Sequence, residues 1–352
     1  MVHSDLEMFN QNSEQLVTIF GGSGYIGSIL TRLFLEQGYR VRVFDSFLFG
    51  DDGVKDLRHH SLEVVTGDIC NISQVSAATR GANIVILLAD LAGRRFVSRH
   101  ANDAYYRDVN YLAASVVLHA AREYGAERFI YASSDSVYGS GEGLVYETSM
   151  PVPISLYARL KLRMEDIVIR AKTREFHPTV LRIATCYGYS QRMRFDLLPN
   201  TILRDAIFTG QVHIESEIAC RSYIHVADAA KVITMCAKTY LSLVSGEIFN
   251  VGVNNQNLTT MELLNVIRMV VSNFSVKVHK GAPDLPNYRL SCRKLEKFLD
   301  FEPSWTMKDG LIDLRNHLTS GTIKDPYDKK YRNGNVFSDE ESSVKTPEKP
   351  TK

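Results

Sequence analysis

The amino-acid sequence predicts an α/β protein built on a parallel sheet with helices on both faces. From residue 16 to about residue 185, short apolar runs rich in β-branched residues alternate with helical or loop segments. That alternation is typical of βαβ units. The first run is followed at once by closely spaced glycines and an amphipathic helical pattern. After residue 185 the segments become shorter and mixed, which predicts a smaller mixed α/β C-terminal lobe.

Six apolar runs are expected to form strands of the sheet. In chain order they read LVTIF, YRVRVFD, LEVVTG, ANIVILLA, ERFIYAS and TVLRIAT. Parallel sheets of this kind bind their ligands at the carboxyl ends of the strands. We therefore expect the functional residues directly after these runs.

The turn after the first run has the spacing of a nucleotide-binding turn. Gly21, Gly24 and Gly27 follow LVTIF in the pattern G-x-x-G-x-x-G and open a helix. Glycines there let backbone N–H groups approach a pyrophosphate at the positive end of the helix. Together with Tyr25 and Ile26, they are predicted cofactor-binding residues of a Rossmann-type doubly wound parallel sheet.

Acidic residues after the next two strands concern the choice of cofactor. Asp45 ends YRVRVFD, where a carboxylate binds ribose hydroxyls and repels a 2′-phosphate, so NAD is favoured over NADP. Arg40 and Arg42 lie nearby in the sequence and could bind a 2′-phosphate, so NADP remains the alternative cofactor. Asp68 and Ile69 follow the third strand. We expect them at an adenine edge, although Asp68 could equally be a helix cap or turn residue.

Residues 131–161 contain the candidate catalytic groups. Ser133 and Ser134 follow the run ERFIYA, and Tyr157 and Lys161 stand four residues apart, on one face of a predicted helix. A hydroxyl, a phenol and an ammonium beside a nucleotide could transfer a proton and a hydride. The ammonium and an oxidised nicotinamide are expected to bring the phenol pKa toward neutrality. Tyr-x-x-x-Lys is common by chance in helix-rich chains, so the accompanying motifs decide its meaning.

These motifs resemble those of a known family. GGSGYIG, Asp45, TGDI, YASSDSVYG, Tyr157-x-x-x-Lys161, LRIATCYGYS and RSYIHVADAAK come in the order seen in extended short-chain dehydrogenase/reductases. The chain specifically resembles the NAD-dependent nucleotide-sugar epimerase/dehydratase family typified by UDP-glucose 4-epimerase, from about residue 16 to about residue 318. The resemblance implies an enzyme that uses NAD and a nucleotide-diphosphate sugar, with Ser134, Tyr157 and Lys161 as catalytic residues.

The resemblance also implies further binding residues. Leu88 and Ala89 would contact the cofactor, and Lys161 would hydrogen-bond the nicotinamide ribose. Asn110 matches a position that supports the active-site helix in relatives, with a simple capping or surface role as the alternative. The implied substrate-binding residues are Asp135, Ser136, Arg192, Arg221, Asp284 and Arg289.

Departures from the family pattern concern the reaction. Ser136 stands where 4,6-dehydratases carry a Glu, beside a retained Asp135, so elimination lacks its base. We therefore expect inversion of C4 through a transient 4-keto intermediate. A nucleotide-sugar oxidoreductase (4-dehydrogenase or ketoreductase) or an atypical dehydratase is the alternative. Asp90 stands where Ala or Gly is usual, and Thr185 where many relatives have Asn.

Two adjacent arginines bear on the sugar. Arg94 and Arg95 fall in a loop that faces the substrate in relatives. They suggest an acidic sugar or an extra phosphate, although a solvated pair is equally plausible.

The C-terminal half has recognisable elements of its own. QVHIES and GEIFNVG are expected strands, and HVADAAKVITMCAKTYLS an expected helix capped near Asp228. LTTMELLNVIRMVV begins with the capping-box pattern, a Thr followed three positions later by a Glu. RKLEKFLD and MKDGLIDLRNHL are expected helices separated by a turn at Pro303.

The expected organisation follows. Residues 1–15 form a loose extension, 16–185 the NAD-binding domain, and 186–319 a substrate lobe with some elements returning to the first domain. The polar tail, residues 320–352, is expected to be disordered or to wrap over a neighbour. In the resembled family, helices equivalent to residues 103–124 and 155–173 form a four-helix dimer interface, which implies a homodimer. Packing on their own sheet alone would leave a monomer.

Composition narrows the class of protein. A net charge of +1, with dispersed Lys and Arg, gives no sign of nucleic-acid binding. The N-terminus is polar and no apolar run reaches about eighteen residues, so we expect a cytoplasmic protein outside the membrane. The five dispersed cysteines predict reduced thiols, without a disulfide framework or a metal site.

Overall fold

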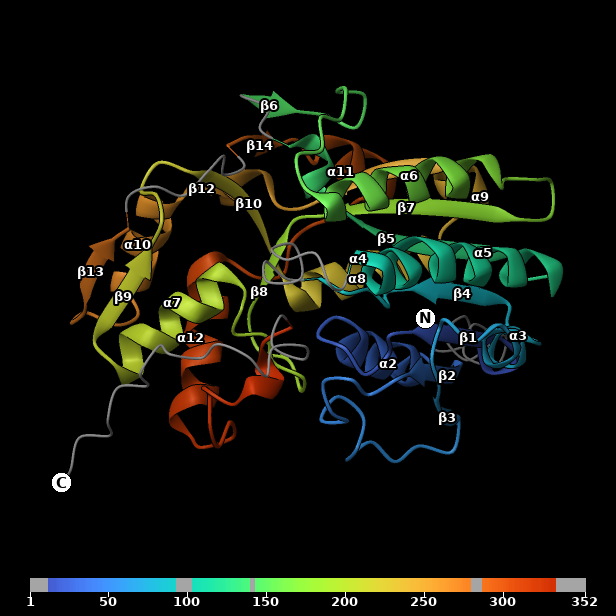
Figure 1. Ribbon diagram of the computed structural model, residues 1–352, viewed down its shortest axis with the longest axis horizontal. Helices are drawn as coiled ribbons and strands as arrows, with labels where there is room; N and C mark the ends of the chain where they lie inside the picture. Colours follow the sequence, from blue (N-terminus) through green and yellow to red (C-terminus); the bar gives the residue numbers. More distant parts are fainter. Residues whose placement is uncertain (1–11, 93–102, 140–142, 280–286, 334–352) are drawn as a thin grey trace, which may run out of the picture.

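The computed structural model describes residues 12–92, 103–139, 143–279 and 287–333 of the chain. A seven-stranded sheet in the order β11-β7-β5-β4-β1-β2-β3 forms its centre, and all neighbouring strands are parallel (Figure 1). The predicted fold class is confirmed. The strands are β1 (Leu16–Phe20), β2 (Arg40–Asp45), β3 (Leu62–Thr66), β4 (Ile84–Leu87), β5 (Arg128–Ser134), β7 (His177–Ile183) and β11 (Glu247–Val251).

Two apolar cores lie on the two faces of this sheet, because alternate strand residues point to opposite sides. Val17 and Ile19 of β1 belong to the core that holds α2 (Gly27–Glu36) and α8 (Val226–Lys238). Phe20, with Phe44 of β2, belongs to the core that holds α3 (Ile72–Thr79), α5 (Ala114–Glu123) and α6 (Leu156–Arg170). The sheet is therefore wound on both faces, as the sequence predicts.

The helix expected over residues 103–124 consists of α4 (Asp103–Arg107), a π-helical segment η2 (Asp108–Ala113) and α5. The π-helical segment carries Asn110, whose buried side chain accepts from Leu91 N at 2.8 Å and donates to Leu91 O at 3.2 Å. Asn110 thus holds the loop that follows β4. The capping and surface interpretations of Asn110 are wrong.

The lobe lies beside the carboxyl edge of the sheet (Figure 1). It contains the sheet β12-β10-β8 and the pairs β13-β9 and β14-β6. Their bounds are β6 (Leu144–Val145), β8 (Thr185–Tyr187), β9 (Gln211–Ile214), β10 (Cys220–His225), β12 (Asn257–Thr259), β13 (Ser275–Val278) and β14 (Arg289–Leu290). The remaining helices are α7 (Leu198–Phe208), α9 (Leu241–Val244), α10 (Thr260–Arg268), α11 (Arg293–Leu299) and α12 (Met307–Thr319).

Two elements after residue 185 return to the first domain, a strand in the central sheet and a helix on one of its faces. The predicted strand GEIFNVG is β11, which pairs in parallel with β7, and α8 packs beside α2. The helix predicted over HVADAAKVITMCAKTYLS begins at Val226, and its N-cap near Asp228 is His225, which accepts from Ala227 N. Asp228 lies in the first turn and accepts from Ser304 N and Trp305 N. The predicted capping box at the start of α10 is confirmed.

The described parts of both terminal segments pack against the body of the protein. The Asn12 side chain donates to Gln37 O at 3.0 Å. Near the other end, Tyr331 packs edge-on against Phe195, and its carbonyl accepts from Phe195 N at 2.8 Å. Residues 320–333 therefore lie against this same chain, whereas residues 334–352 lie outside the described residues.

A buried ion pair joins α6 to the sheet. Arg182 of β7 donates to both carboxylate oxygens of Glu165 at 2.8–3.1 Å, and the two side chains are 4% and 3% exposed. The hydroxyl of Ser133 on β5 donates to the same carboxylate at 2.5 Å. Glu165 lies one helical turn beyond Lys161. The pair therefore fixes the rotation of α6 and the direction of Lys161.

We predict that Glu165→Gln lowers the free energy of unfolding by about 3–5 kcal/mol, because it leaves the Arg182 guanidinium buried without its counter-charge. Urea unfolding measures this. The matched control is Asp166→Asn, which removes an ion pair to Arg170 between side chains that are 58% and 78% exposed. That variant should stay within about 0.5 kcal/mol of wild type. Equal effects of the two substitutions would contradict the prediction.

Candidate active site

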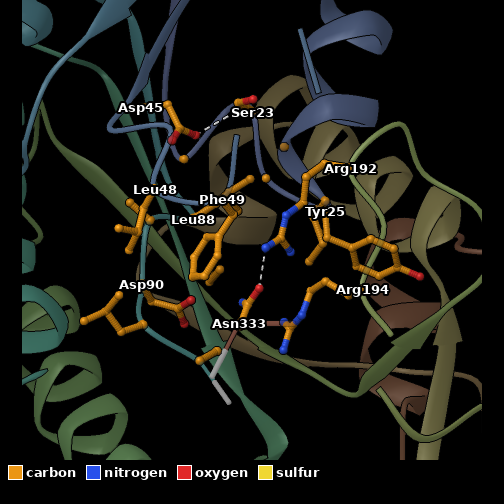
Figure 2. A pocket seen from close by; sticks show the side chains of 18 of the residues that line it. Ser23, Tyr25, Asp45, Leu48, Phe49, Leu88, Asp90, Arg192, Arg194 and Asn333 are labelled. Atoms are coloured by element: carbon orange, nitrogen blue, oxygen red, sulfur yellow. Dashed lines mark hydrogen bonds between the residues drawn. The ribbon is translucent and has the colours of Figure 1, made fainter. Parts of the chain in front are cut away.

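A cavity of about 330 Å³ lies at the carboxyl ends of β1, β2, β4 and β5, and the segment after β8 closes it from the lobe side. Figure 2 shows Asp45 at one end and Asp90 at the other. The predicted catalytic residues Ser134 and Tyr157 line it. So do the predicted cofactor-binding residues Gly21, Gly24, Tyr25, Ile26, Gly27, Asp45, Asp68, Ile69, Leu88 and Ala89.

The glycine turn is packed too closely for side chains. Gly21 has φ +85°, and a Cβ there would lie 2.7 Å from Ala89 N. A Cβ on Gly27 would lie 2.1 Å from Gly21 O. The buried hydroxyl of Ser23 has no hydrogen-bond partner among the described residues. Backbone free of Cβ atoms, a helix N-terminus and an unsatisfied hydroxyl fit the pyrophosphate of a dinucleotide.

The Asp45 carboxylate is held in place by backbone donors. It accepts from Ser23 N at 3.0 Å (Figure 2). It also accepts from Phe47 N at 2.9 Å. Burial raises its pKa, and these hydrogen bonds oppose the shift. Arg42 points elsewhere, since its guanidinium donates to Glu63 at 2.7 Å. The Asp45 carboxylate therefore fits a ribose with free hydroxyls, which is the ribose of NAD.

Asp68 acts as a turn residue that also lines the cavity. Its carboxylate accepts from Cys70 N at 2.9 Å, and the N-cap of α3 is Asn71. The helix-cap interpretation of Asp68 is therefore wrong. The turn and adenine-edge interpretations are compatible with each other.

The phenol and the ammonium meet on one carboxylate. Tyr157 Oη donates to Asp90 Oδ2 at 2.9 Å, and Lys161 Nζ lies 2.9 Å from the same oxygen. Lys161 also donates to Ala132 O at 2.7 Å. The three residues come from α6 and from the loop after β4. Their contact depends on the fold, because Asp90 is far from Tyr157 in the sequence.

The protein's own side chains raise the pKa of the Tyr157 phenol, whereas the sequence predicts that Lys161 lowers it. Burial raises the pKa of Tyr157 well above its ordinary value, and the Asp90 charge raises it further. Asp90 offsets the positive charge of Lys161, which was expected to stabilise the phenolate.

Ser134 begins a short turn with two more residues of the segment. Its hydroxyl accepts from Ser136 N at 3.2 Å and contacts Asp135 Oδ1 at 3.4 Å. Burial raises the pKa of Asp135 to about 7, although the charge of Arg221 opposes this. The Ser136 hydroxyl is buried without a partner among the described residues.

Some predicted substrate-binding residues lie elsewhere than expected. Arg192 lies toward the Asp45 end, over the Phe49 ring at 4.6 Å, and donates to Asn333 at 2.5 Å. Burial lowers its pKa to about 10. Arg221 and Arg289 are not among the described residues that line the cavity, and Arg289 is exposed on β14. Asp284, Arg94 and Arg95 lie outside the described residues.

Several residues that line the cavity were not predicted from the sequence, and three of them carry polar or aromatic groups that bear on the site. Phe49, Arg194 and Asn333 all line it (Figure 2). Arg194 forms a two-point ion pair with Asp196. Asn333 belongs to the polar tail, in which Tyr331 is one of the aromatic residues that pack onto the lobe.

The described ranges hold neither a cluster of metal ligands nor a helix that could span a membrane. No three His, Cys, Asp or Glu side chains gather as metal ligands there. No helix in those ranges has the length and apolar character needed to span a membrane. The five cysteines are free thiols, of which Cys70 is exposed.

The fold and this cavity define a dinucleotide-binding protein of the Rossmann type with a Tyr–Lys pair beside the cofactor groove. The chain belongs to the NAD dependent epimerase/dehydratase family, whose model matches residues 17–252. Family membership confirms the predicted family, enzyme class and cofactor NAD.

Known proteins resemble the chain over most of its length. It is 27% identical over 319 residues to dTDP-glucose 4,6-dehydratase of Streptomyces niveus, covering 84% of this chain and 90% of that one. It is 29% identical to UDP-glucose 4-epimerase of Yersinia pestis, covering 67% and 77%. The structure of UDP-glucuronic acid 4-epimerase from Bacillus cereus with UDP-glucuronic acid and NAD superposes with TM-score 0.79 at 21% identity, covering 87% and 99%.

Burial of Asp135 makes stability depend on pH. Its pKa of about 7 lies above the unfolded value, so the folded protein binds the proton more tightly. Stability from this group is full below about pH 4 and is lost as pH rises through about 7. We predict that wild type loses on the order of 2 kcal/mol relative to Asp135→Asn between about pH 5 and 8. Urea unfolding at several pH values measures this difference, and parallel curves for the two proteins would contradict it.

Proposed function

We propose that the protein is an NAD-dependent epimerase that inverts C4 of a nucleotide-diphosphate hexose through a transient 4-keto sugar. The observation that carries the proposal is that Ser134 and Tyr157 line the same cavity as the glycine turn and Asp45. A sugar bound beside that phenol would adjoin the nicotinamide end of the dinucleotide. The similarity to UDP-glucose 4-epimerase of Yersinia pestis supports this choice of reaction.

The chain's own task is to remove and return one proton. Bound NAD supplies the hydride acceptor. The Tyr157 oxygen would take the proton of the C4 hydroxyl as its own phenolic proton leaves, and Ser134 would hydrogen-bond the sugar oxygen and the phenol. Lys161 positions the nicotinamide ribose. After the keto sugar has turned in the cavity, Tyr157 returns the proton while hydride adds to the opposite face.

The nucleotide-diphosphate part of the substrate would extend toward the lobe. Arg221 lies near enough to Asp135 for its charge to oppose the rise in that carboxyl's pKa. Its guanidinium suits two phosphate oxygens, so we retain it as the proposed pyrophosphate ligand. The Bacillus cereus structure holds UDP-glucuronic acid, so an acidic hexose is a candidate beside the neutral ones.

A dehydratase is the second candidate. Asp135 has a pKa of about 7, and a carboxylic acid that keeps its proton near neutrality suits protonation of a leaving hydroxyl. The Streptomyces niveus relative is named a 4,6-dehydratase. Ser136 supplies no carboxylate as the base that elimination needs, so we rank epimerisation first.

The homodimer remains part of the proposal. Arg163 of α6 stacks over the Tyr111 ring of η2 at 4.6 Å, so these helices lie side by side. Leu112 beside them is 55% exposed, which leaves an apolar side chain for a second copy. Sedimentation velocity tests this proposal, and a single-chain mass at micromolar concentration would exclude the homodimer.

We predict that a panel of UDP-, dTDP-, CDP- and GDP-hexoses, followed by NMR, gives one pair of C4 epimers in equilibrium. Tyr157→Phe should lower kcat about 10²–10⁴-fold because the phenolic proton carrier is gone, while NAD binding measured by calorimetry stays unchanged. Tyr240→Phe, at a tyrosine that is 81% exposed, is the matched control and should have wild-type turnover. Full activity of Tyr157→Phe, or products formed by loss of water from the hexose, would refute the proposed epimerase activity.

A further inference from the structure

Asp90 is held rigidly at the end of β4. Ala89 N donates to Phe20 O at 2.8 Å, and Leu91 is bound at both its N–H and its carbonyl by the Asn110 side chain. Residues on either side of Asp90 are therefore anchored. Its carboxylate lines the cavity while only 19% of the side chain is exposed.

The phenol of Tyr157 and the ammonium of Lys161, both on α6, contact the same oxygen of this carboxylate. Tyr157 donates its phenolic proton to Asp90 Oδ2, and Lys161 Nζ lies at the same 2.9 Å from it. A proton can pass directly along such a short hydrogen bond. Asp90 Oδ2 is thus the proton-accepting atom that directly contacts the phenol.

The surrounding charges leave few other destinations for a proton. Among the described residues, the titratable or charged groups near the phenol besides Asp90 are Tyr106 of α4, Tyr131 of β5, Lys161 of α6 and Arg194 after β8. Burial raises the pKa of Tyr106 and Tyr131, so both stay neutral. Arg194 is paired with Asp196. The negative charge of Asp90 offsets the positive charge of Lys161. A Tyr157 phenolate is therefore disfavoured before the reaction starts.

We propose that Asp90 accepts, through Tyr157, the proton released when the sugar hydroxyl is oxidised, and returns it when the keto sugar is reduced. The proposal rests on the proposed function. It makes Asp90 a proton-relay residue that acts on the substrate through Tyr157.

The step balances. The C4 hydroxyl proton moves to Tyr157 Oη as the phenolic proton moves to Asp90 Oδ2, so the phenol remains neutral. The electron pair of the C4–H bond leaves as hydride to the oxidised nicotinamide, and the C4–O bond becomes a carbonyl. The reverse transfers, with hydride delivered to the other face of the sugar, restore the carboxylate and give the epimer.

The direction in which kcat changes when Asp90 is substituted distinguishes a proton relay from a carboxylate that only destabilises the Tyr157 phenolate. If Asp90 is a relay, Asp90→Asn lowers kcat at neutral pH about 10–100-fold. The acid limb of the pH dependence of kcat then moves to higher pH, because the Tyr157 phenolate itself must form. Asp90→Glu restores part of the rate. If Asp90 only hinders phenolate formation, Asp90→Asn and Asp90→Ala raise kcat, and that result overturns the proposal. Asp166→Asn, exposed on α6, is the control.

A second readout does not require turnover. Ultraviolet difference titration of the NAD-saturated protein, with Tyr157→Phe as the blank, reports ionisation of Tyr157. Asp90→Asn should lower that pKa by about one unit or more, since an adjacent negative charge is removed. An unshifted titration overturns the relay even in an active enzyme. A shifted titration in a protein that turns over no nucleotide sugar rejects the proposed function instead, and the relay with it.

Discussion

The buried ion pair between Glu165 and Arg182 is the constraint on which the active site depends. A charge pair removed from water is stable only when its hydrogen bonds are complete. Here Arg182 also donates to the Tyr138 hydroxyl, and Tyr138 donates to Asn250 of β11. The network thus joins α6 to three neighbouring strands. Because α6 cannot rotate without breaking it, the Tyr157 and Lys161 face stays turned toward the cavity.

The parallel sheet supplies the second half of the site. Gly21, Asp45, Asp90 and Ser134 follow or end four different strands, and the carboxyl ends of parallel strands meet at one edge. This is why the sequence could predict where the cavity lies and could name its glycine turn, Asp45, Ser134 and Tyr157. Strand alternation, the glycine turn and the Tyr157–Lys161 spacing are local patterns, and each predicts a structure from a few neighbouring residues. The placement of β11 required pairing across the chain, which no local pattern encodes.

What the sequence could not show concerns distance and charge. Asp90 was visible as a departure, but its contact with Tyr157 depends on how Asn110 holds the loop after β4. Without that contact, Lys161 was expected to lower the phenol pKa, and the structure gives the opposite direction. Asn333 was hidden because a polar tail gives no periodic signal, although it reaches Arg192 inside the cavity. The reaction is therefore shaped by residues that composition and spacing leave undecided.

Isotope tracing from C4 tests the central claim most directly, because a hydride taken from C4 and returned to C4 never exchanges with water. With a nucleotide-diphosphate hexose carrying deuterium at C4, the account predicts that both epimers keep the full label at C4. Loss of deuterium to solvent, or its appearance at C6, would contradict the account and point to elimination or to enolisation instead.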